Sequence, residues 1–347
     1  MKSPLHIINR LWQRTSDHFR RKRFAGALEH LHGPSVLHSR PGEVIAIVLV
    51  RNGSYYLDTF MTYYRAMGIK HFVFMDNGSE DDTIERIMQY PDTIIDRCVL
   101  PLAEYEGLMR AYPAETYGQE RWCFYIDMDE VFDFEGRESH GIRGLTSYME
   151  AQGQTALVAQ MLEMFPKAAL AEVADMPFEE VLREFRYFDI STVDRFDYHS
   201  PEIEFSALLR DNEASNSDIQ FCFGGVRGKV FDEACCLTKH PLIFNGEGVT
   251  PAPHPHLSMG VSCADVTAVI KHYKFANNLL GRDAVTLSSG AVAHGEDAAR
   301  AEVMTQSADL SLFSLDARRW NRIDTLYRAG FLNPSESYSA HLAKGTP

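Results

Sequence analysis

Two aspartates, Asp127 and Asp129, directly follow an apolar run that ends at Ile126. If that run is a buried strand, both carboxylates lie at its carboxyl end, where open α/β sheets bind their ligands. Further acidic residues at Glu130 and Asp133 make this density of like charge costly unless a cation or solvent relieves it. Mg²⁺ or Mn²⁺, held by one or two carboxylates and by substrate phosphates, suits that role. A metal-free acidic loop explains the same string, because Asp-x-Asp alone is a weak pattern.

The elements that must position these aspartates alternate between apolar runs and helical patterns. Buried strands are predicted at residues 43–50, 69–75, 93–100 and 122–126. Helices are predicted between them at residues 54–68, 79–91 and 103–117, with Ser54 and Ser79 as N-caps. Such alternation implies a parallel sheet with right-handed crossovers. The expected fold class is therefore α/β, with a Rossmann-like, mostly parallel sheet flanked by helices.

Polar side chains follow three strands of this sheet and are expected to converge on one crevice. Arg51 and Asn52 end the first strand, Asp76 and Asn77 the second, and Asp127 the fourth. Asp76 is expected to accept hydrogen bonds from a nucleobase or ribose, although Asp-Asn-Gly-Ser is also a turn sequence. Arg51 is expected to face a pyrophosphate or, alternatively, solvent. The convergence is more specific than any one of these strings.

The strings Val48–Asn52, His71–Thr83 and Trp122–Glu130 resemble the opening of a family 2-like glycosyltransferase. The similarity is closest to a bacterial branch whose signature is a strand, an Asp-Asn-Gly-Ser turn and an Asp-x-Asp-Glu. Gly53 departs from this pattern, since the family more often has an acidic residue after the asparagine. The resemblance covers residues 43–135 and continues in fragments at residues 224–227, 238–242 and 270–275.

This resemblance implies a GT-A fold, a nucleotide-sugar donor (by default a UDP-sugar) and Mn²⁺ or Mg²⁺ as cofactor. It implies that Asp129 is a direct metal ligand and that Asp127 contacts the metal or the donor ribose. His272, in a predicted strand, resembles the third metal ligand of GT-A enzymes, whereas a hydrogen-bonded core histidine is the alternative. His254 and His256, in a proline-rich loop that cannot join a central sheet, are a rival pair.

Two further segments carry candidate site residues. The glycine-rich, basic string at residues 224–229 could bring its backbone to a phosphate that Arg227 or Lys229 neutralises, or it is a flexible turn before a strand at Val230. Glu163 interrupts an apolar run, and burial there would raise its pKa and suit a general base for the acceptor. An exposed strand position explains Glu163 equally well. Other acidic residues are equally eligible, and inversion or retention at the anomeric carbon is open.

The chain has 347 residues, enough for one enlarged α/β domain with appendages. We expect a basic helical arm and linker at residues 1–40, a glycosyltransferase domain at 41–300, and a C-terminal helix and tail at 301–347. Within the last part, residues 309–329 are predicted to be helical and residues 338–347 to be a frayed tail. Residues 288–297 are predicted to be a mobile loop. Six cysteines without a CxxC pair read as reduced core thiols.

Charge is unevenly distributed along the chain. Residues 1–40 contain eight Lys and Arg against Asp17 and Glu29, a balance of +6. The remainder carries −20, since the whole chain carries −14, and this excludes nucleic acid as a partner. The basic arm could contact an anionic bilayer, or dock on the acidic body of its own domain. No run is long enough to span a membrane, so we expect a cytoplasmic protein, possibly at the inner face of the membrane.

The sequence therefore predicts a metal-dependent glycosyltransferase that moves sugar to a glycan, lipid-linked or other envelope acceptor. Its predicted donor-binding residues are Arg51, Asn52, Asp76, Asn77, Asp127 and Arg227; its predicted metal ligands are Asp127, Asp129 and His272; and its predicted catalytic residue is Glu163. A nucleotidyltransferase-like enzyme and a non-catalytic nucleotide-sugar binding module are the alternatives. A dinucleotide-binding enzyme is disfavoured, because no GxGxxG follows Val50.

Overall fold

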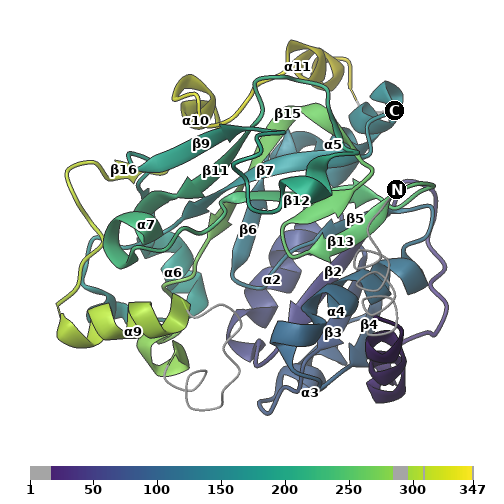
Figure 1. Cartoon of the computed structure of the whole chain (residues 1–347), viewed down its shortest axis with the longest axis horizontal. Helices are drawn as coiled ribbons and strands as arrows, with labels where there is room; N and C mark the ends of the chain where they lie inside the picture. The colour runs from purple at the N-terminus through teal and green to yellow at the C-terminus, as the bar shows by residue number, and fades with distance from the viewer. Residues whose placement is uncertain (1–16, 284–295, 308, 346–347) are drawn as a thin grey trace, which may run out of the picture.

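A computed structural model describes residues 17–283, 296–307 and 309–345 (Figure 1). Its centre is a ten-stranded sheet. In spatial order the strands are β1 (Glu29–His32), β4 (Thr93–Arg97), β3 (His71–Asp76), β2 (Val44–Val50), β5 (Trp122–Tyr125), β12 (Thr238–Phe244), β7 (Ala156–Glu163), β15 (Ser262–His272) and β10 (Glu213–Ala214), with β6 (Glu130–Asp133) paired to β15.

Most of this sheet is parallel. Only β1, β12 and β6 run against the other strands of the described sheet. The four strands predicted from apolar runs correspond to β2, β3, β4 and β5, and helices connect them as expected. The expected fold class, an α/β protein with a Rossmann-like, mostly parallel sheet flanked by helices, is confirmed.

Strand β2 shows why the sheet is covered on both faces. Its alternate residues Val44, Ala46 and Val48 join one apolar cluster, whereas Ile45 and Ile47 join another. The first cluster includes side chains of α2 (Ser54–Ala66), α3 (Thr83–Ile87) and α5 (Arg137–Gln152). The second includes side chains of α4 (Leu102–Tyr117). A strand buried on both faces needs a continuous apolar run, and this is what the sequence of β2 supplies.

Smaller elements surround the sheet. The two-stranded ones are β9 (Val193–Asp197) with β11 (Gln220–Gly224), β13 (Thr250–His254) with β14 (Leu257–Met259), and β8 (Tyr187–Phe188) with β16 (Arg318–Arg319). Further helices are α6 (Phe178–Glu184), α7 (Gly225–Phe231), α9 (Glu296–Gln306), α10 (Asp324–Arg328) and α11 (Glu336–Ala343), with 3₁₀ turns at Leu170–Val173 and Ser206–Leu209. Residues 17–27 and 279–283 are also helical. None of the described helices is long and apolar enough to cross a membrane.

Two predicted helix starts are corrected by the structure. Helix α2 begins at Ser54 itself, with Gly53 as N-cap. The Ser54 hydroxyl donates to Asp81 at 2.7 Å instead of capping its own helix, so the next loop satisfies this helix end. Helix α3 begins at Thr83 and not at Ser79, because the Ser79 N–H is already bound by the Asp76 carboxylate.

Other corrections concern the ends of the chain and the glycine-rich string. His30–His32 lie in edge strand β1 and are not part of a linker. Residues 225–231 form helix α7 and not a turn followed by a strand. Of the predicted helix at 309–329, only α10 is helical. The predicted frayed tail contains α11, because Tyr338 is fully buried in the core. Residues 1–16 and most of the predicted mobile loop lie outside the described residues.

The topology brings the ends of five strands together at one edge of the sheet. Strand β12 runs against β5 and β7, so its first residues lie beside their carboxyl ends. Strand β15 runs parallel to β7, with His272 in register with Glu163. Strand β6 pairs with β15 and places Glu130 opposite His272. Side chains that are far apart in the sequence therefore meet at this edge.

Candidate functional site

The centre of the candidate site is a chain of alternating charges. His272 lies between two carboxylates, with Nε2 at 3.4 Å from Asp129 and Nδ1 at 3.1 Å from Glu163. The guanidinium of Arg227 lies 3.5 Å from Glu163. These residues come from the loop after β5, the ends of β15 and β7, and helix α7. Four residues predicted from the sequence for three different roles thus form one contact network.

Burial and charge compete within this network. Burial disfavours protonation of His272, but Glu163 and Asp129 outweigh it and raise its pKa to about 10. Burial likewise opposes ionisation of Asp129, yet His272 holds the pKa of that carboxyl below its usual range. The pKa of Glu163 is also lowered, again because His272 overcomes the effect of burial. Without a bound ligand, the network is therefore a charged carboxylate–imidazolium–carboxylate arrangement.

The chain of charges continues away from the sheet to helix α9. Arg227 donates to Glu233 at 2.5 Å, and Arg300 donates to the same carboxylate at 2.8 Å. Arg300 also binds Asp283 at 2.8 and 3.1 Å and is fully buried. Helix α9 is thus connected through side-chain ion pairs to the carboxylate that holds His272.

A second cluster surrounds Asp127. One carboxylate oxygen accepts two hydrogen bonds from Arg110, each at 3.2 Å, and the other accepts one from Lys239 at 3.0 Å. Lys239 also donates to Glu130, which is almost completely buried. Burial opposes ionisation of Asp127, but Arg110 and Lys239 outweigh it and hold the pKa of Asp127 well below its usual range. The acidic string at the end of β5 is therefore neutralised mainly by cations of the chain itself.

Sequence reasoning did not assign roles to Arg110 and Lys239. Arg110 lies within α4, where it also forms an i,i+4 ion pair with Glu106 at 2.9 Å. Lys239 lies at the start of β12, a strand whose antiparallel direction could not be deduced from its apolar pattern. In the sequence, Lys239 was indicated by the fragment at residues 238–242, which resembles the glycosyltransferase family.

The residues predicted at the ends of β2 and β3 are used differently. Asp76 is fully buried and accepts hydrogen bonds from the N–H groups of Gly78 and Ser79 and from Arg97 at 2.7 Å. Asn77 donates to the carbonyls of Cys98 and Leu100. These contacts are those of the turn-forming alternative for Asp-Asn-Gly-Ser.

The Arg51–Asn52 turn completes this region. Asn52 has a positive φ of 53°, and its side-chain oxygen accepts hydrogen bonds from the N–H groups of Glu80 and Asp81. Arg51 is exposed, with its guanidinium 3.8 Å from Glu80. The first two strand ends therefore do converge; Asp76 and Asn77 are buried there, whereas Arg51 and Asn52 are exposed.

Packing explains why a glycine occupies position 53. A Cβ at this position would lie 2.5 Å from the sulfur of Met128 and 2.7 Å from a methyl carbon of Val50. An acidic side chain, which the resembling family more often has here, would therefore displace Met128, the residue between Asp127 and Asp129. The departure from the family pattern is coupled to the packing of the acidic string.

The predicted metal ligands do not form a ready-made three-residue site. Among the described residues, no group of three or more His, Cys, Asp and Glu side chains is arranged to hold a metal ion. Both oxygens of Asp127 are bound by cations of the chain, and its role as a metal ligand stays a prediction. Asp129 and His272 remain a compatible pair. The contact of Glu163 with Nδ1 is the arrangement that usually orients a ligating histidine.

Glu163 is an unfavourable general base in this arrangement. Its side chain is 2% exposed and lies between His272 and Arg227. A lowered pKa makes a carboxylate a weaker base. The contacts fit an orienting role for His272 better, and the catalytic assignment of Glu163 remains a prediction.

His254 and His256 lie beside the second cluster and not at the first. They flank the β13–β14 turn, outside the central sheet as expected. His256 Nδ1 contacts the carbonyl of Thr238, next to Lys239. Burial, with Lys239 and Arg110 nearby, lowers the pKa of His256 well below its usual value. Gly107 in α4 lets this hairpin approach, since a Cβ there would lie 3.3 Å from the Pro253 carbonyl.

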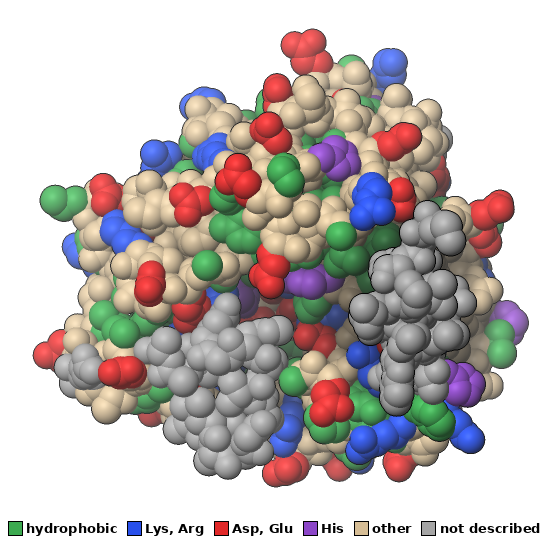
Figure 2. Space-filling view, in the orientation of Figure 1, with side chains coloured by type: hydrophobic (Ala, Val, Ile, Leu, Met, Phe, Trp, Pro, Cys, Tyr) green, Lys and Arg blue, Asp and Glu red, His purple; other side chains and the backbone are tan. Residues whose placement is uncertain are grey.

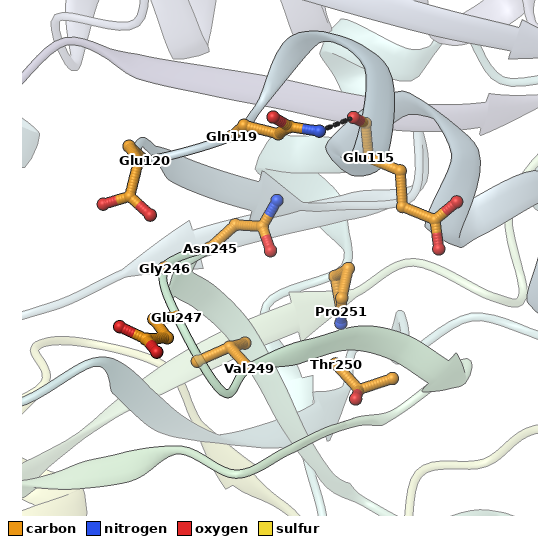
Figure 3. Close-up of a pocket in the computed structure, with 9 residues that line it drawn as sticks. All are labelled: Glu115, Gln119, Glu120, Asn245, Gly246, Glu247, Val249, Thr250 and Pro251. Carbon is orange, nitrogen blue, oxygen red and sulfur yellow. Dashed lines mark hydrogen bonds between the residues drawn. The ribbon is translucent and has the colours of Figure 1, made fainter.

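The cavities found elsewhere in the molecule lie apart from this site. Figure 2 shows acidic, basic and histidine side chains gathered around a hollow near the middle of one face. A different cavity of about 330 Å³ is lined by Glu115, Glu120 and Glu247, with Asn245 between them (Figure 3). It lies at the opposite edge of the sheet, because it contains the C-terminal end of α4 and the residues after β12. Neither it nor a cavity of about 590 Å³ beside β1 and β4 includes a residue of the two charged clusters.

Comparison with known proteins assigns the chain to no family, since no family model and no curated protein matches it. Among solved structures, S. aureus TarS is similar over 37% of this chain and 24% of TarS, with 15% identity and a TM-score of 0.29. A 4-diphosphocytidyl-2C-methyl-D-erythritol synthase is similar over 38% and 65%, with 12% identity and a TM-score of 0.25. A UDP-glucose pyrophosphorylase complexed with UDP-glucose is similar over 87% and 99%, with 9% identity and a TM-score of 0.25. Similarities this low transfer no property of those proteins to this chain.

Proposed function

We propose that the chain is a glycosyltransferase that moves a sugar from a nucleoside diphosphate sugar, by default a UDP-sugar, to a glycan, lipid-linked or other envelope acceptor. One observation carries the proposal. Asp129, His272 and Glu163 meet at the carboxyl edge of a mostly parallel sheet, beside the cations that fix Asp127. This edge is where α/β sheets bind nucleotides and related ligands.

In the proposed reaction, an acceptor hydroxyl oxygen forms a bond to the anomeric carbon of the donor sugar. The bond between that carbon and the diphosphate oxygen breaks, and the electron pair stays on the departing nucleoside diphosphate. The hydroxyl proton passes to a base or to solvent. Negative charge therefore grows on the diphosphate, and fixed cationic groups in a site of low dielectric constant stabilise it.

Lys274 is the side chain that we assign to this growing charge. It follows β15 by two residues, lies close enough to Asp129 to affect its titration, and is only partly exposed. No carboxylate of the described residues forms an ion pair with Lys274 in the structure, unlike Arg110, Lys239 and Arg227. Burial, together with Arg227 and Arg300, lowers the pKa of Lys274. An anion bound beside Lys274 would relieve both effects.

Asp129 and His272 are the residues that would hold Mn²⁺ or Mg²⁺, with phosphate and water oxygens completing the coordination. When bound, such an ion supplies Lewis-acid stabilisation of the diphosphate. Glu163 would hold the His272 ring by its Nδ1, and Arg227 would hold Glu163. Asp127, fixed by Arg110 and Lys239, would present a preoriented carboxylate to the donor ribose.

The test is a thermal-shift panel of nucleotides and nucleotide sugars, each with Mn²⁺, Mg²⁺ or chelator. A true donor at about 100 times its dissociation constant adds roughly 2.7 kcal/mol to the free energy of unfolding. We expect stabilisation that requires both nucleotide and cation and that is lost in Asp129→Asn. Asp82→Asn, which alters an exposed acid on another loop, is the matched control and keeps it. Indifference to every nucleotide would contradict the proposal.

A nucleotidyltransferase-like reaction is the second candidate, and one observation favours keeping it. The site gathers Arg110, Lys239 and Lys274 in addition to Arg227, and this is more positive charge than the sequence had indicated. A triphosphate needs such a broad basic site. Incubation with nucleoside triphosphates and sugar 1-phosphates distinguishes the two reactions, because only a nucleotidyltransferase releases pyrophosphate.

A further inference from the structure

Four part-exposed aromatic rings from four separate segments lie in a row, which we call the aromatic row. Its members are Phe196 of β9, Phe223 of β11, Phe205 just before the 3₁₀ turn, and His254 at the end of β13. Ring centroids are 5.6 Å apart for Phe196–Phe223, 6.1 Å for Phe223–Phe205 and 4.8 Å for Phe205–His254. Each ring packs on the next, while none of the four is fully buried.

The aromatic row leads directly to the candidate site. The His254 and His256 ring centroids are 5.8 Å apart. His256 contacts the Thr238 carbonyl at 3.0 Å, and the next residue, Lys239, binds Asp127. Phe223, the second ring of the row, forms a backbone bridge with Cys236, whose thiol donates to the same Thr238 carbonyl. Two independent connections thus tie the row to the start of β12, beside Asp127.

His256 adds a hydrogen-bond acceptor beside the aromatic row. Burial and the neighbouring Lys239 lower its pKa, so the imidazole is neutral. Its Nδ1–H donates to the Thr238 carbonyl, and Nε2 is therefore a hydrogen-bond acceptor. A row of part-exposed aromatic faces ending in a neutral acceptor suits a ligand with an apolar face and hydroxyl edges.

We propose that the aromatic row, with His256, binds a pyranose ring of a saccharide acceptor. This inference rests on the proposed glycosyltransferase function and names the acceptor class for it. The C–H face of the pyranose stacks on the rings of Phe205 and His254, and one of its hydroxyl groups donates to His256 Nε2. The acceptor then lies next to Asp127, the residue that we assign to the donor ribose.

The position of the row favours a saccharide over the donor nucleobase. In the sheet order β3–β2–β5–β12, the predicted nucleotide side is at β3 and β2, whereas the row adjoins β12. Asp127, at the end of β5, lies between the two sides. Donor and acceptor would therefore lie on either side of Asp127 along this edge of the sheet.

The experiment is ligand-detected saturation-transfer NMR with methyl β-D-glucopyranoside, methyl β-D-galactopyranoside and methyl α-D-mannopyranoside as probes. We expect at least one glycoside to receive saturation at its ring C–H protons. Phe205→Leu keeps an apolar side chain but removes the aromatic face. We expect it to weaken binding of that glycoside about fivefold, the size of one stacking contact. Phe223→Leu should weaken binding of the glycoside as well. Phe313→Leu, a part-exposed ring that packs on Tyr187 at a distance from the row, is the matched control and leaves it unchanged.

Thermal melting of each variant shows whether it is folded. If Phe205→Leu does not fold, Phe223→Leu still tests the inference. Absence of saturation in all three glycosides, or equal weakening by Phe205→Leu and Phe313→Leu, overturns the inference. Uridine that binds with the same dependence on Phe205 overturns it in favour of a nucleobase site. If UDP stabilises the protein but no glycoside binds, this inference fails and the proposed function stands. If glycosides bind at the row and no nucleotide stabilises the protein, the row stands and the glycosyltransferase proposal fails.

Discussion

The strand ends of β2 and β3 and those of β5, β7 and β15 both carry polar side chains, but they use them differently. At β3, Asp76 and Asn77 are bound mainly by backbone N–H and carbonyl groups of nearby loops. At β5 and β15, Asp129 and His272 are bound by side chains from other segments. Side chains saturated by the backbone build a turn, whereas ionised side chains held by one another can exchange partners when a ligand arrives. The comparison teaches that the Asp-Asn-Gly-Ser string makes the contacts of a turn in this structure, whereas its role in donor binding stays a prediction.

The largest effect expected within the ion-paired region is on stability. Arg300→Ala removes the buried partner of both Glu233 and Asp283 and should cost about 3–5 kcal/mol, because it leaves buried carboxylates uncompensated. Urea unfolding of the purified variant measures this. Arg322→Ala, which removes an exposed pair with Asp324, should leave the free energy of unfolding nearly unchanged. Equal losses in the two variants would show that the buried chain of charges contributes no more than a surface pair.

The second effect separates chemistry from stability. Asp129→Asn keeps the shape of the side chain but weakens its attraction for His272 and for a cation, so transfer activity should fall about 100-fold or more. The melting temperature should change little by comparison. Donor turnover with Mn²⁺, compared with Asp82→Asn, is the measurement. Full activity of Asp129→Asn would remove this region from the chemistry.

The third effect is expected at the end of β3, where a substitution should reduce stability but not donor binding. Asp76→Ala leaves the N–H groups of Gly78 and Ser79 and the guanidinium of Arg97 without their acceptor, and should cost about 2 kcal/mol of stability. The donor KM of the folded fraction should stay within about twofold, because Asp76 is fully buried. Denaturant unfolding and steady-state kinetics test the two parts. A large rise in KM at normal stability would restore the nucleotide-binding role of Asp76.

The last effect concerns pH and needs a chelator, so that no metal competes for His272. The pKa of His272 is raised from 6.5 to about 10 in the folded chain. Its contribution to stability is therefore fully present below pH 6.5 and is lost as the pH rises toward 10. Melting curves of the wild-type protein should decline over this range, and those of His272→Gln should decline less. Parallel curves would contradict the charged state of His272.

Much of the fold could be predicted because its strands are apolar runs buried on both faces. Strands β2 to β5 follow from that pattern, and so does the expectation that the ends of β2 and β3 meet. The direction of β12 and the register of β15 against β7 could not be predicted, since neither is encoded in local periodicity. For the same reason Lys239 was not assigned a role.

The errors in helix prediction have a related cause. Tertiary packing overrides local composition at α11, where Tyr338 anchors a segment that looks like a polar tail. At α7, two glycines with positive φ, Gly224 and Gly225, turn the chain directly from β11 into a helix. That helix, and not a flexible loop, is what brings Arg227 to Glu163. The candidate site was predicted as a set of residues, whereas their pairing required the fold.

Isothermal titration of UDP, in the presence of Mn²⁺, into the wild-type protein, Asp129→Asn and Lys274→Met tests the central claim most directly. The account predicts binding to the wild-type protein that disappears with chelator and is weakened at least about tenfold in both variants. Equal affinity in all three proteins, or affinity that ignores the metal, would contradict the claim that the ion-paired edge of the sheet is a diphosphate site.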